Sequence, residues 1–482
     1  MLPCCAALSL LAGCGGHAPE PATVAPARNL AVLCLDTVRY DVFSLPETAG
    51  LEDRLAPLLE DALVFEHGQS PAPWTVPAVA SLLTGLYPNQ HGAGRFDEEI
   101  ADLSSTVPAA IRAEVQTLPE LLSAAGFATA AFVAHPWFRT GYGLDRGFGS
   151  LELGNDSAAL TRRSLRWLDD PSAAGRETAA GERPFFVYLH FMEAHERYRQ
   201  PVEQVEEIVG AMPREVRDAG TALAAGFACG DATSERCRRL LAYVDTVLQL
   251  RAVVADFLAG LAERRLLDDT VVVVYSDHGE EFDDHLGEER AEGLDPRSIY
   301  GAGHGHTLYQ ELLHVPLAIW RPGVPGRRVA TPVTLVDLVP SLADWLAASR
   351  LGTAERELPG RPIDALVAGE PEPSRALFSS GIAYGPRQLA VFDGRRKRIH
   401  FPGQGIARLF DLERDPGEKA PLHDRRLALP LDRQLSRYLA LTASPARGES
   451  PEIPPDLLEQ LQSLGYLEGA GDRAAAADEE LP

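Results

Sequence analysis

Four continuous apolar runs stand out along the chain, at residues 29–35, 128–134, 184–189 and 270–276. Within each run apolar residues follow one another, which is typical of strands buried on both faces, as in a parallel sheet. Helical patterns lie between the runs, notably at residues 118–125 and 247–267. This alternation predicts an α/β fold with a doubly wound, mostly parallel sheet.

The pattern changes after residue 375. Short apolar runs then predict a small antiparallel sheet with a tight turn; they occupy residues 388–392, 397–401 and 407–412, and the turn residues 415–417. Leucines that share one face predict a helix at residues 331–348, and residues 455–464 predict a last amphipathic helix. We therefore expect a small C-terminal α+β subdomain beside the large sheet.

Residues 73–92 predict a loop that leads into a short helix. Thr75 is the expected N-cap, residues 78–84 form a compact helical run, and Gly85 is a natural C-terminal stop. A hydroxyl at this position faces unpaired N–H groups and the positive end of the helix dipole, so an anion could bind beside it. Taken alone, the same pattern is that of an ordinary capping threonine.

Each apolar run is followed by a residue able to do chemistry. These residues are Asp36, His135, His190 with His195 shortly after it, and Asp277 with His278. Because ligands bind at the carboxyl ends of parallel strands, four of these side chains are expected to converge on one edge: Asp36, His135, His195 and Asp277. Carboxylates and imidazoles are natural ligands for a divalent ion, and Thr75 could complete the set.

The composition limits the classes of function. With 482 residues, of which 45% are hydrophobic, the chain can bury a large core. Its formal net charge of −24 argues against nucleic acid as a partner, because a phosphate backbone requires a basic surface. The sequence indicates no oligomeric state.

The N-terminus is similar to a bacterial lipoprotein signal. A short apolar run ends in Leu-Ala-Gly-Cys at residues 11–14, which resembles a lipobox with Cys14 as the lipidated residue. This predicts a lipoprotein anchored to the membrane of the cell envelope, facing the periplasm or the exterior. Residues 1–7 lack the usual Lys or Arg, which leaves a merely apolar leader open.

The expected layout follows from these features. It comprises a signal segment at 1–14, a flexible tether at 15–27, a large α/β domain at 28–375, a small subdomain with the terminal helix at 376–466, and an acidic disordered tail at 467–482. In an oxidising compartment, Cys229 and Cys237 could form a local disulfide.

Five segments in a fixed order carry a family resemblance. They are Asn29 to Asp41, Thr75-Val76-Pro77 through to His91-Gly92, Tyr188 to His195, Ser276-Asp277-His278-Gly279-Glu280, and His304-Gly305-His306-Thr307-Leu308-Tyr309 through to Leu317. Together they resemble the sulfatase family of the alkaline phosphatase superfamily, and residues 410–416 are similar to that family's small domain.

The resemblance implies a metal site and a nucleophile. Asp36, Thr75, Asp277 and His278 would hold a divalent ion (Ca, Mn, Zn or Mg), and Thr75 would also be the nucleophile. Metal binding would lower the pKa of its hydroxyl group. Four ligands indicate one ion. A second ion would need further ligands among His195, His285 and His306, and the sequence leaves the number open.

The resemblance also implies roles for two further histidines. His195 and His304 would contact the transferred group or the leaving oxygen, and a protonated imidazole could donate the proton. His306 and His285 lie nearby and could take the place of His304. We expect His190 to be a packed core histidine, while the role of His135 is open.

The chain departs from the family at the nucleophile. A sulfatase carries Cys or Ser in C/S-x-P-x-R, which is converted to formylglycine, whereas here the motif reads Thr75-Val76-Pro77-Ala78-Val79. Thr cannot become that aldehyde, and Val79 stands in place of the Arg. Thr37 also stands where sulfatases often have a second Asp. A phosphorylated Thr can be hydrolysed by water, but a sulfated Thr lacks the hemiacetal exit.

Our leading hypothesis is a metal-dependent hydrolase of anionic esters with a Thr75 nucleophile. Its substrate would be a small-molecule, glycan or lipid ester, and a phosphate or phosphonate ester in preference to a sulfate ester. Three alternatives stay open: a sulfatase that acts without formylglycine, a phosphoryl-group transferase of the cell envelope, and a non-catalytic binding lipoprotein.

Overall fold

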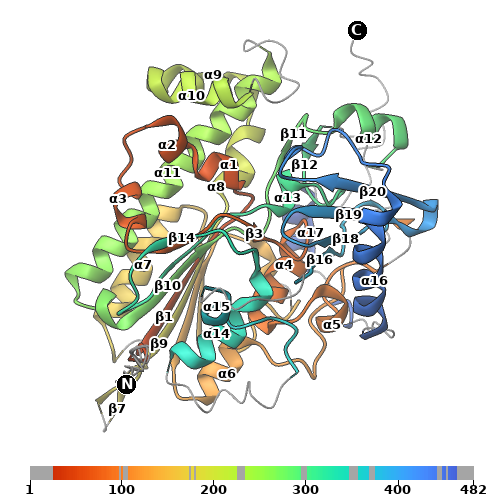
Figure 1. The fold of residues 1–482 in the computed structure, drawn as a ribbon. Helices are drawn as coiled ribbons and strands as arrows, with labels where there is room; N and C mark the ends of the chain where they lie inside the picture. The colour runs from red at the N-terminus through yellow and green to blue at the C-terminus, as the bar shows by residue number, and fades with distance from the viewer. Residues whose placement is uncertain are drawn as a thin grey trace, which may run out of the picture.

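An eight-stranded sheet forms the centre of the protein in a computed structural model (Figure 1). The structure describes residues 25–96, 99–100, 107–139, 141–172, 175–178, 181–224, 234–294, 301–346, 357–367, 375–441, 448–451 and 454–463. The strand order is β14-β2-β13-β10-β1-β9-β5-β6. The strands are β1 Asn29–Leu35, β2 Leu63–Phe65, β5 Ala128–Val133, β6 Ser150–Leu153, β9 Phe185–Phe191, β10 Thr270–Tyr275, β13 Leu317–Trp320 and β14 Arg327–Val329.

The four predicted strands are neighbours at the centre of this sheet. β10, β1, β9 and β5 pair in parallel, β6 extends the parallel part, and β13 runs antiparallel to β10 and β2. All residues of the four central strands are buried. The predicted mostly parallel sheet is therefore confirmed. One boundary was wrong: β9 continues to Phe191, so His190 lies inside the strand instead of after it.

Helices cover both faces of the sheet, as Figure 1 shows. In β1, Leu30, Val32 and Cys34 belong to one apolar cluster and Ala31, Leu33 and Leu35 to the other, because successive side chains point to opposite faces. The first cluster includes residues of α4 Thr75–Thr84, α6 Leu118–Ala124 and α14 Leu338–Trp345. The second includes residues of α7 Ser157–Asp169 and α11 Glu235–Glu263. The doubly wound arrangement is thus confirmed.

Two predicted helices have other bounds than expected. α11 begins at Glu235, well before residue 247, because the Ser234 side chain caps it by accepting from the Cys237 N–H. The helix predicted at residues 331–348 is restricted to α14. Before it, β15 Val333–Thr334 pairs with β3 Gly68–Gln69, and a capping box at Thr334 starts a 3-10 turn. Pairing with a distant strand thus replaced the first part of the predicted helix.

The remaining elements are short or lie at the periphery. The helices are α1 Tyr40–Phe43, α2 Leu45–Ala49, α3 Ala56–Leu59, α5 Pro88–His91, α8 Glu193–Glu196, α9 Val202–Ala211, α10 Arg214–Ala224, α12 Leu286–Glu292, α13 Gln310–Leu313 and α15 Ile363–Val367. The strands are β4 Glu99–Ile100, β7 Glu177–Thr178, β8 Gly181–Glu182, β11 Glu281–Phe282, β12 Ala302–Gly303 and β17 Gly385–Pro386. The 3-10 turns include η1 Pro136–Arg139, which follows His135, and η2 Arg197–Arg199, which follows α8.

A four-stranded antiparallel sheet follows, in the order β16-β18-β19-β20. Its strands are β16 Leu377–Ser380, β18 Leu389–Phe392, β19 Arg396–Phe401 and β20 Ile406–Asp411, which confirms the predicted small sheet. Helix α16 Arg425–Leu441 packs against it and was not predicted. The terminal helix α17 Pro455–Ser463 begins at the predicted residue, and its Leu457 and Leu461 join the core of the large sheet.

Several predictions fall on residues that the structure does not describe. These are the leader with Cys14, most of the tether, Cys229 and the acidic tail. The lipid anchor and the disulfide therefore stay predictions, as do the domain limits. Cys237 itself is buried at the start of α11. None of the helices in the described ranges combines the length and apolar character that crossing a bilayer requires.

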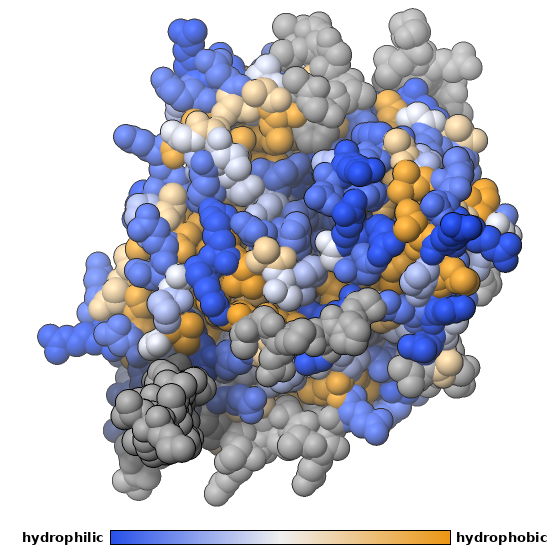
Figure 2. All heavy atoms as spheres, viewed as in Figure 1, coloured by the Kyte–Doolittle hydropathy of each residue, from blue (hydrophilic) through white to orange (hydrophobic). Residues whose placement is uncertain are grey.

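The surface in Figure 2 mixes hydrophilic residues with smaller hydrophobic areas. Among the residues that the structure describes, the exposed large hydrophobic side chains come from separate segments: Val107, Leu153, Ile406, Leu422 and Leu429. Such scattered residues are normal on a protein surface and need no special explanation.

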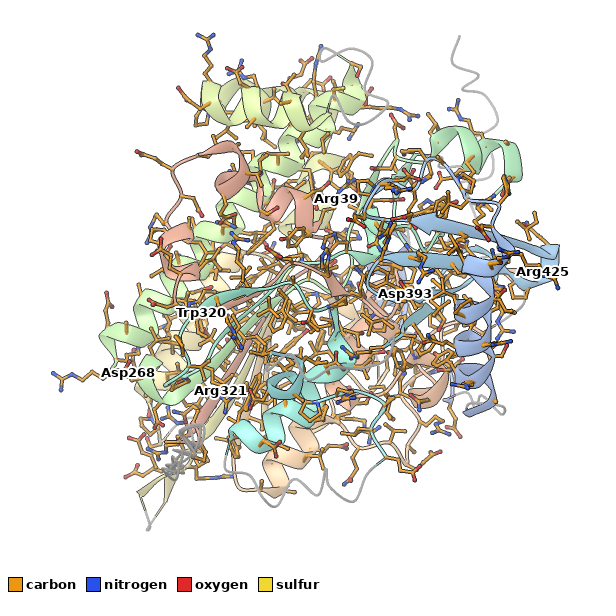
Figure 3. The ribbon with its side chains drawn as sticks, viewed as in Figure 1. Arg39, Asp268, Trp320, Arg321, Asp393 and Arg425 are labelled. Carbon is orange, nitrogen blue, oxygen red and sulfur yellow. The ribbon has the colours of Figure 1, made fainter. Side chains whose placement is uncertain are left out.

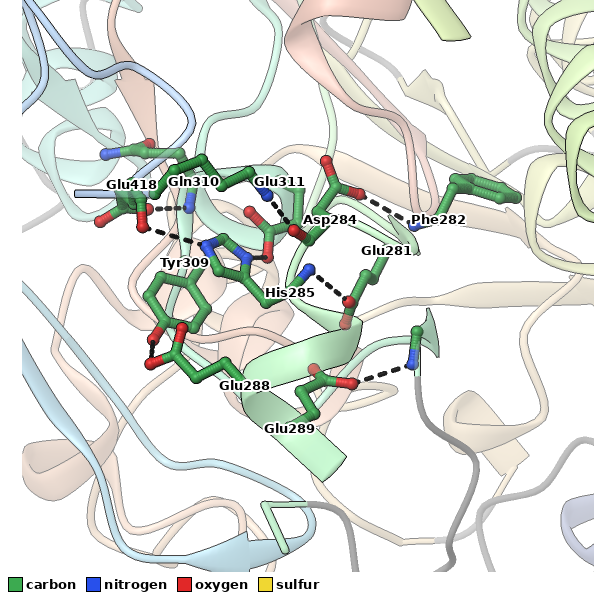
Figure 4. A network of polar contacts seen from close by, with 12 residues as sticks. Glu281, Phe282, Asp284, His285, Glu288, Glu289, Tyr309, Gln310, Glu311 and Glu418 are labelled. Carbon is green, nitrogen blue, oxygen red and sulfur yellow. Dashed lines mark hydrogen bonds and ion pairs between the residues drawn. The ribbon is translucent and has the colours of Figure 1, made fainter. Parts of the chain in front are cut away.

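A buried polar network connects the starts of α12 and α13 with the small sheet (Figure 4). His285 lies between Glu311, whose Oε1 is 2.9 Å from Nδ1, and the Glu418 carbonyl, 3.3 Å from Nε2. The Glu418 carboxylate accepts from the Gln310 N–H at 2.6 Å and pairs with Lys397 at 3.0 Å. Burial lowers the pKa of His285, but the Glu311 carboxylate outweighs burial and raises the pKa to about 9. His285 is therefore a cation that both acceptors satisfy.

We predict that His285→Ala lowers the free energy of unfolding by about 3 kcal/mol near pH 6, because the buried Glu311 carboxylate loses its partner. The folded-state pKa of about 9 exceeds the ordinary histidine pKa of 6.5, so the contribution of His285 is complete below pH 6.5. It is lost as the pH rises through about 9. Urea unfolding at pH 6 and at a pH above 9 measures the difference.

The matched control is His423→Ala, because His423 is exposed. It should leave the unfolding free energy within about 0.5 kcal/mol of the wild type at both pH values. A loss for His285→Ala that stays the same above pH 9 would contradict the charged state assigned to this imidazole.

Candidate active site

Three candidate metal ligands meet at the carboxyl ends of two neighbouring strands. Asp36 directly follows β1, and Asp277 and His278 follow β10, which pairs with β1 in parallel. Their ligand atoms all lie within 4.8 Å of one another, and all three residues are fully buried. His278 Nε2 is 3.6 Å from Asp36 Oδ1 and 3.5 Å from Asp277 Oδ2. The structure thus brings Asp36 and Asp277 together, as the strand pattern predicted, with His278 beside them.

Hydrogen bonds fix the orientation of His278. Its Nδ1 is 2.9 Å from the Gly279 carbonyl oxygen, which can only accept, so Nδ1 carries the proton. The lone pair of Nε2 then faces the two carboxylates, as a metal ligand requires. Gly279 is necessary at this turn because a side chain there would collide with the Glu311 carbonyl.

Thr75 faces the same centre. Its Oγ1 lies 3.3 Å from His278 Nε2, and the residue is fully buried. The predicted N-cap role was wrong: Trp74 is the N-cap of α4, and Thr75 is its first helical residue. The side chain of Thr75 lies beside the imidazole, and no side-chain cap closes the helix start. Gly85, with φ 70°, ends α4 as predicted.

The donor set fits a divalent cation. Among the described residues, Asp36 Oδ1 and Asp277 Oδ2 have no hydrogen-bond donor although both are buried. Burial, and next the charge of Asp277, raise the pKa of Asp36 well above its ordinary range. Two buried carboxylates with unpaired oxygens beside an imidazole lone pair are costly without a cation and suit a hard or borderline metal ion.

Two histidines lie beside the other oxygen of Asp36, and one of them is within hydrogen-bond distance. His190 Nε2 is 2.9 Å from Asp36 Oδ2, and His135 Nε2 is 3.6 Å from the same atom. The Tyr188 hydroxyl lies 3.0 Å from His190 Nδ1, which lets Nε2 donate to the carboxylate. The sequence predicted a packed core histidine at 190, and the residue is buried, but its contact with Asp36 was missed. Its position within β9 gave no signal of this contact.

Thr37 does not add a ligand. It adopts the left-handed backbone conformation, with φ 61°, and its hydroxyl donates to the Asp36 carbonyl at 2.7 Å. Val79, four residues after Thr75 on α4, is fully buried in the apolar cluster beneath the sheet. Neither side chain therefore supplies charge to the site.

His195 and His304 lie on the far side of His278. The ring centroids of His304 and His278 are 4.4 Å apart, and those of His195 and His304 are 5.0 Å apart. His304 Nδ1 is 3.1 Å from Glu280 Oε2, and Arg199 approaches Glu280 Oε1 at 3.5 Å. Burial lowers the pKa of His195 well below its usual value, which keeps this imidazole neutral near pH 7.

The two alternatives to His304 lie elsewhere. His285 belongs to the network of Figure 4, and His306 Nε2 is 2.8 Å from Glu281 and 2.7 Å from Glu289. Burial lowers the pKa of His306, but the Glu289 carboxylate outweighs burial and raises the pKa well above its usual value. This cluster is therefore a charged imidazole between two glutamates.

A further cation supports the turn after β10. Arg39 lies inside the molecule (Figure 3), where its Nη1 donates to the Glu280 carbonyl at 3.2 Å and to Asp284 at 2.8 Å. Sequence reasoning assigned no role to Arg39, Arg199 or Glu280. Arg39 and Glu280 lie within the family segments 29–41 and 276–280, so their place in these segments was an available signal, whereas Arg199 had none.

Comparison with known proteins identifies the family. A match to the sulfatase family covers residues 28–348. The chain belongs to the sulfatase family. This is a family of hydrolases that act on ester bonds, within the alkaline phosphatase superfamily. The predicted family is thereby confirmed.

Two curated relatives share low sequence identity with this chain. The choline-sulfatase of Rhizobium meliloti (strain 1021) is 27% identical over 298 residues, which are 58% of this chain and 53% of that protein. The human N-sulphoglucosamine sulphohydrolase is 26% identical over 400 residues, 77% of this chain and 70% of that protein. The chain thus spans about half the length of the choline-sulfatase.

Solved structures share the fold at lower identity. A structure described in work on the metabolism of glycosaminoglycans by Bacteroides thetaiotaomicron matches with a TM-score of 0.66 and 16% identity, over 92% of this chain and 100% of that chain. The phosphonate monoester hydrolase of Agrobacterium radiobacter matches with a TM-score of 0.60 and 19% identity, over 87% and 96%. These matches show the α/β fold of the chain.

We predict that the protein stripped with EDTA binds a divalent ion and that Asp277→Asn abolishes measurable binding. His190→Phe should weaken metal affinity by roughly 10–100-fold, because Asp36 loses the donor that orients it. Isothermal titration with Ca, Mn, Zn and Mg measures both effects.

The control is Asp268→Asn, since Asp268 lies at the edge of the molecule in Figure 3 and is exposed. It should bind metal like the wild type. Equal affinities of Asp277→Asn and the wild type for every ion tested would exclude this site.

Proposed function

We propose that the protein is a metal-dependent hydrolase of anionic esters that uses Thr75 as its nucleophile. Phosphate or phosphonate monoesters would be its substrates in preference to sulfate esters. The observation that carries this proposal is the Thr75 hydroxyl 3.3 Å from His278 Nε2, beside two unpaired carboxylates. A threonine hydroxyl at this place can form and release a phosphoryl ester without any modification of the side chain.

The start of α4 favours an anionic group next to Thr75. Thr75 is the first helical residue, so the N–H groups of Thr75 and Val76 have no acceptor within the helix. The ten-residue helix adds the positive end of its dipole at the same point. A phosphoryl group beside Thr75 would therefore meet N–H donors from one side and the metal ligands from the other.

A bound divalent ion would be held by Asp36, Asp277, His278 and Thr75, and would lower the pKa of the attacking hydroxyl and neutralise charge on the phosphoryl group. The Thr75 hydroxyl gives up its proton to water and its oxygen attacks phosphorus. The bond between phosphorus and the leaving oxygen breaks, and the leaving oxygen takes a proton from His304. Water then attacks the phosphorus of phospho-Thr75, which breaks the bond to Oγ1, restores the hydroxyl and releases phosphate. A sulfated Thr75 could not release sulfate by collapse of a hemiacetal, because a threonine side chain does not form one.

His304 is the proposed proton donor to the leaving oxygen. Its Nδ1 donates to Glu280 at 3.1 Å, which orients the ring and leaves Nε2 to face the leaving oxygen. His195 is fully buried and kept neutral, so it serves as a hydrogen-bonding partner within the site. The two histidines thus have different proposed roles because their surroundings differ.

The comparisons support a hydrolase of anionic esters. The choice between a phosphoryl and a sulfuryl group rests on the residues of this chain. Phosphonate monoester hydrolases from Agrobacterium radiobacter and Silicibacter pomeroyi share the fold, as do several proteins described as sulfatases. A sulfatase that acts without formylglycine is the second candidate, because the curated relatives are named sulfatases. Formation of an alkyl phosphate from an added alcohol would indicate a phosphoryl transferase. Metal binding without turnover of any ester would indicate a binding lipoprotein.

We also propose that the protein is held at the cell envelope by a lipid on Cys14. The proposal rests on the lipobox-like residues 11–14 alone. A glycan or lipid ester of the envelope would then be within reach of the site.

We predict that the metal-loaded protein hydrolyses an aryl phosphate or a phosphonate monoester at least about 100-fold faster, in kcat/KM, than the matching aryl sulfate. Thr75→Ala should lose roughly 1,000-fold or more of this activity, because the nucleophile is removed. Thr84→Ala is the matched control: it lies on the same helix, and its hydroxyl donates to the Ala80 carbonyl at 2.7 Å and accepts from the Leu86 N–H at 3.3 Å.

Turnover of the aryl sulfate above the aryl phosphate would support the sulfatase instead. Full activity of Thr75→Ala would refute the nucleophile. A wild-type protein that binds metal but turns over no phosphate, phosphonate or sulfate ester would point to the binding lipoprotein.

We further expect acid quenching during turnover of an aryl phosphate to trap a phosphoryl group on Thr75, detectable by mass spectrometry of the peptide. Addition of an alcohol tests how the intermediate resolves. Release of inorganic phosphate at an unchanged rate supports the hydrolase, whereas formation of the alkyl phosphate identifies a transferase. An unmodified Thr75 peptide during steady turnover would contradict covalent catalysis by this residue.

A further inference from the structure

The side chain of Arg199 extends from the surface of the protein to the buried site. The side chains proposed to react are almost completely inaccessible: Thr75, Asp36 and His195 are 0% exposed, and His304 is 3% exposed. Arg199, the last residue of η2, has a side chain that is 32% exposed, and it reaches Glu280 inside the site. A substrate that approaches from solvent on this side would meet Arg199 before it meets the nucleophile.

The contacts of Arg199 hold its guanidinium group at this position. Its Nε donates to the Tyr198 hydroxyl at 2.7 Å, and the group lies over the Tyr198 ring, 5.3 Å from the centroid. Nη2 is 3.5 Å from Glu280 Oε1, well beyond the 2.7–2.9 Å of a strong charge-assisted hydrogen bond. The pairing with Glu280 is therefore loose, and an incoming anion could replace it without loss of the contacts to Tyr198.

The charge of Arg199 also acts across the site. After burial, the Arg199 guanidinium is the largest influence that lowers the pKa of His195. Arg199 approaches Glu280 at 3.5 Å, and Glu280 is 3.1 Å from His304, so the cation lies beside the histidines of the site. The site needs such a charge, because Val79 on α4 lies in the apolar core and supplies none.

We infer that Arg199 binds the oxygens of the substrate's phosphoryl group and selects doubly charged phosphate monoesters over singly charged esters. A guanidinium group can grip two oxygens of a phosphate at once, which favours a group that carries two negative charges. The inference rests on the proposed function, because it places the transferred group between Thr75 and Arg199. It narrows the substrate class from anionic esters to phosphate monoesters.

A purely structural role of Arg199 predicts a different result. If the side chain only fixed η2 against Glu280, its removal would affect all substrates equally, and stability would change with activity. Binding of a second anionic group far from the reacting phosphorus is a further possibility. It would make the effect of Arg199 depend on the leaving group instead of the phosphoryl charge.

The first test compares two esters with the same aryl leaving group: the doubly charged phosphate monoester and the singly charged methylphosphonate monoester. Arg199→Ala in the metal-loaded protein should lower kcat/KM for the phosphate by about 100-fold, and that for the phosphonate by no more than about 5-fold. Arg199→Lys should retain part of the selectivity, and added guanidinium should partly restore Arg199→Ala. Arg197→Ala is the matched control from the same turn, because its guanidinium contacts the exposed Gln249.

Unfolding temperatures of both variants within about 3 °C of the wild type would establish that the fold is kept. Equal losses on the two esters would overturn the inference. So would an effect that follows the charge of the leaving group.

The second test does not require turnover. Isothermal titration of metal-loaded Thr75→Ala with inorganic phosphate should show binding, and Arg199→Ala in the same background should weaken it by about 10–100-fold. Unchanged phosphate affinity would refute the role of Arg199. If the wild type hydrolyses no ester at all, the proposed function fails, and this titration still decides whether Arg199 is an anion-binding residue.

Discussion

The site depends on two carboxylates that the sheet forces together in the interior. Asp36 and Asp277 end neighbouring parallel strands, so their separation is fixed by the hydrogen-bond register of β1 and β10. Each keeps an oxygen without a donor among the described residues. Buried charges of one sign repel strongly where water is excluded. A cation at the strand ends removes this cost, and the donors that remain around it determine the chemistry.

Two groups of side chains surround this pair. On the side of the sheet, His190 inside β9 contacts Asp36, and the Tyr188 hydroxyl fixes the imidazole of His190. On the side of the loops, Glu280 orients His304 and is approached by Arg199. The first group is rigid because its residues belong to the central strands. The second group comes from loops and short turns, where groups that meet substrate are usually placed.

The family fold does not determine which group is transferred. Sulfatases and phosphonate monoester hydrolases share the architecture of this chain, so the architecture does not select between sulfur and phosphorus. We propose that the selection lies in a few side chains at the strand ends, at the start of α4 and on η2. In this proposal a threonine at residue 75, an apolar side chain at residue 79 and an arginine on η2 favour phosphoryl chemistry.

The sequence by itself determined the central strands, the residues that follow β1 and β10, and the glycine stop of α4, because each is encoded by neighbouring residues. It also contained the apolar spacing of α16, although this was not recognised. Only the tertiary structure decided that His190 contacts Asp36, 154 positions away, and that Arg199 reaches Glu280. It also decided that Thr75 faces His278 instead of capping its helix. Such contacts depend on how distant segments pack against each other, and no local pattern of apolar and polar residues records that packing.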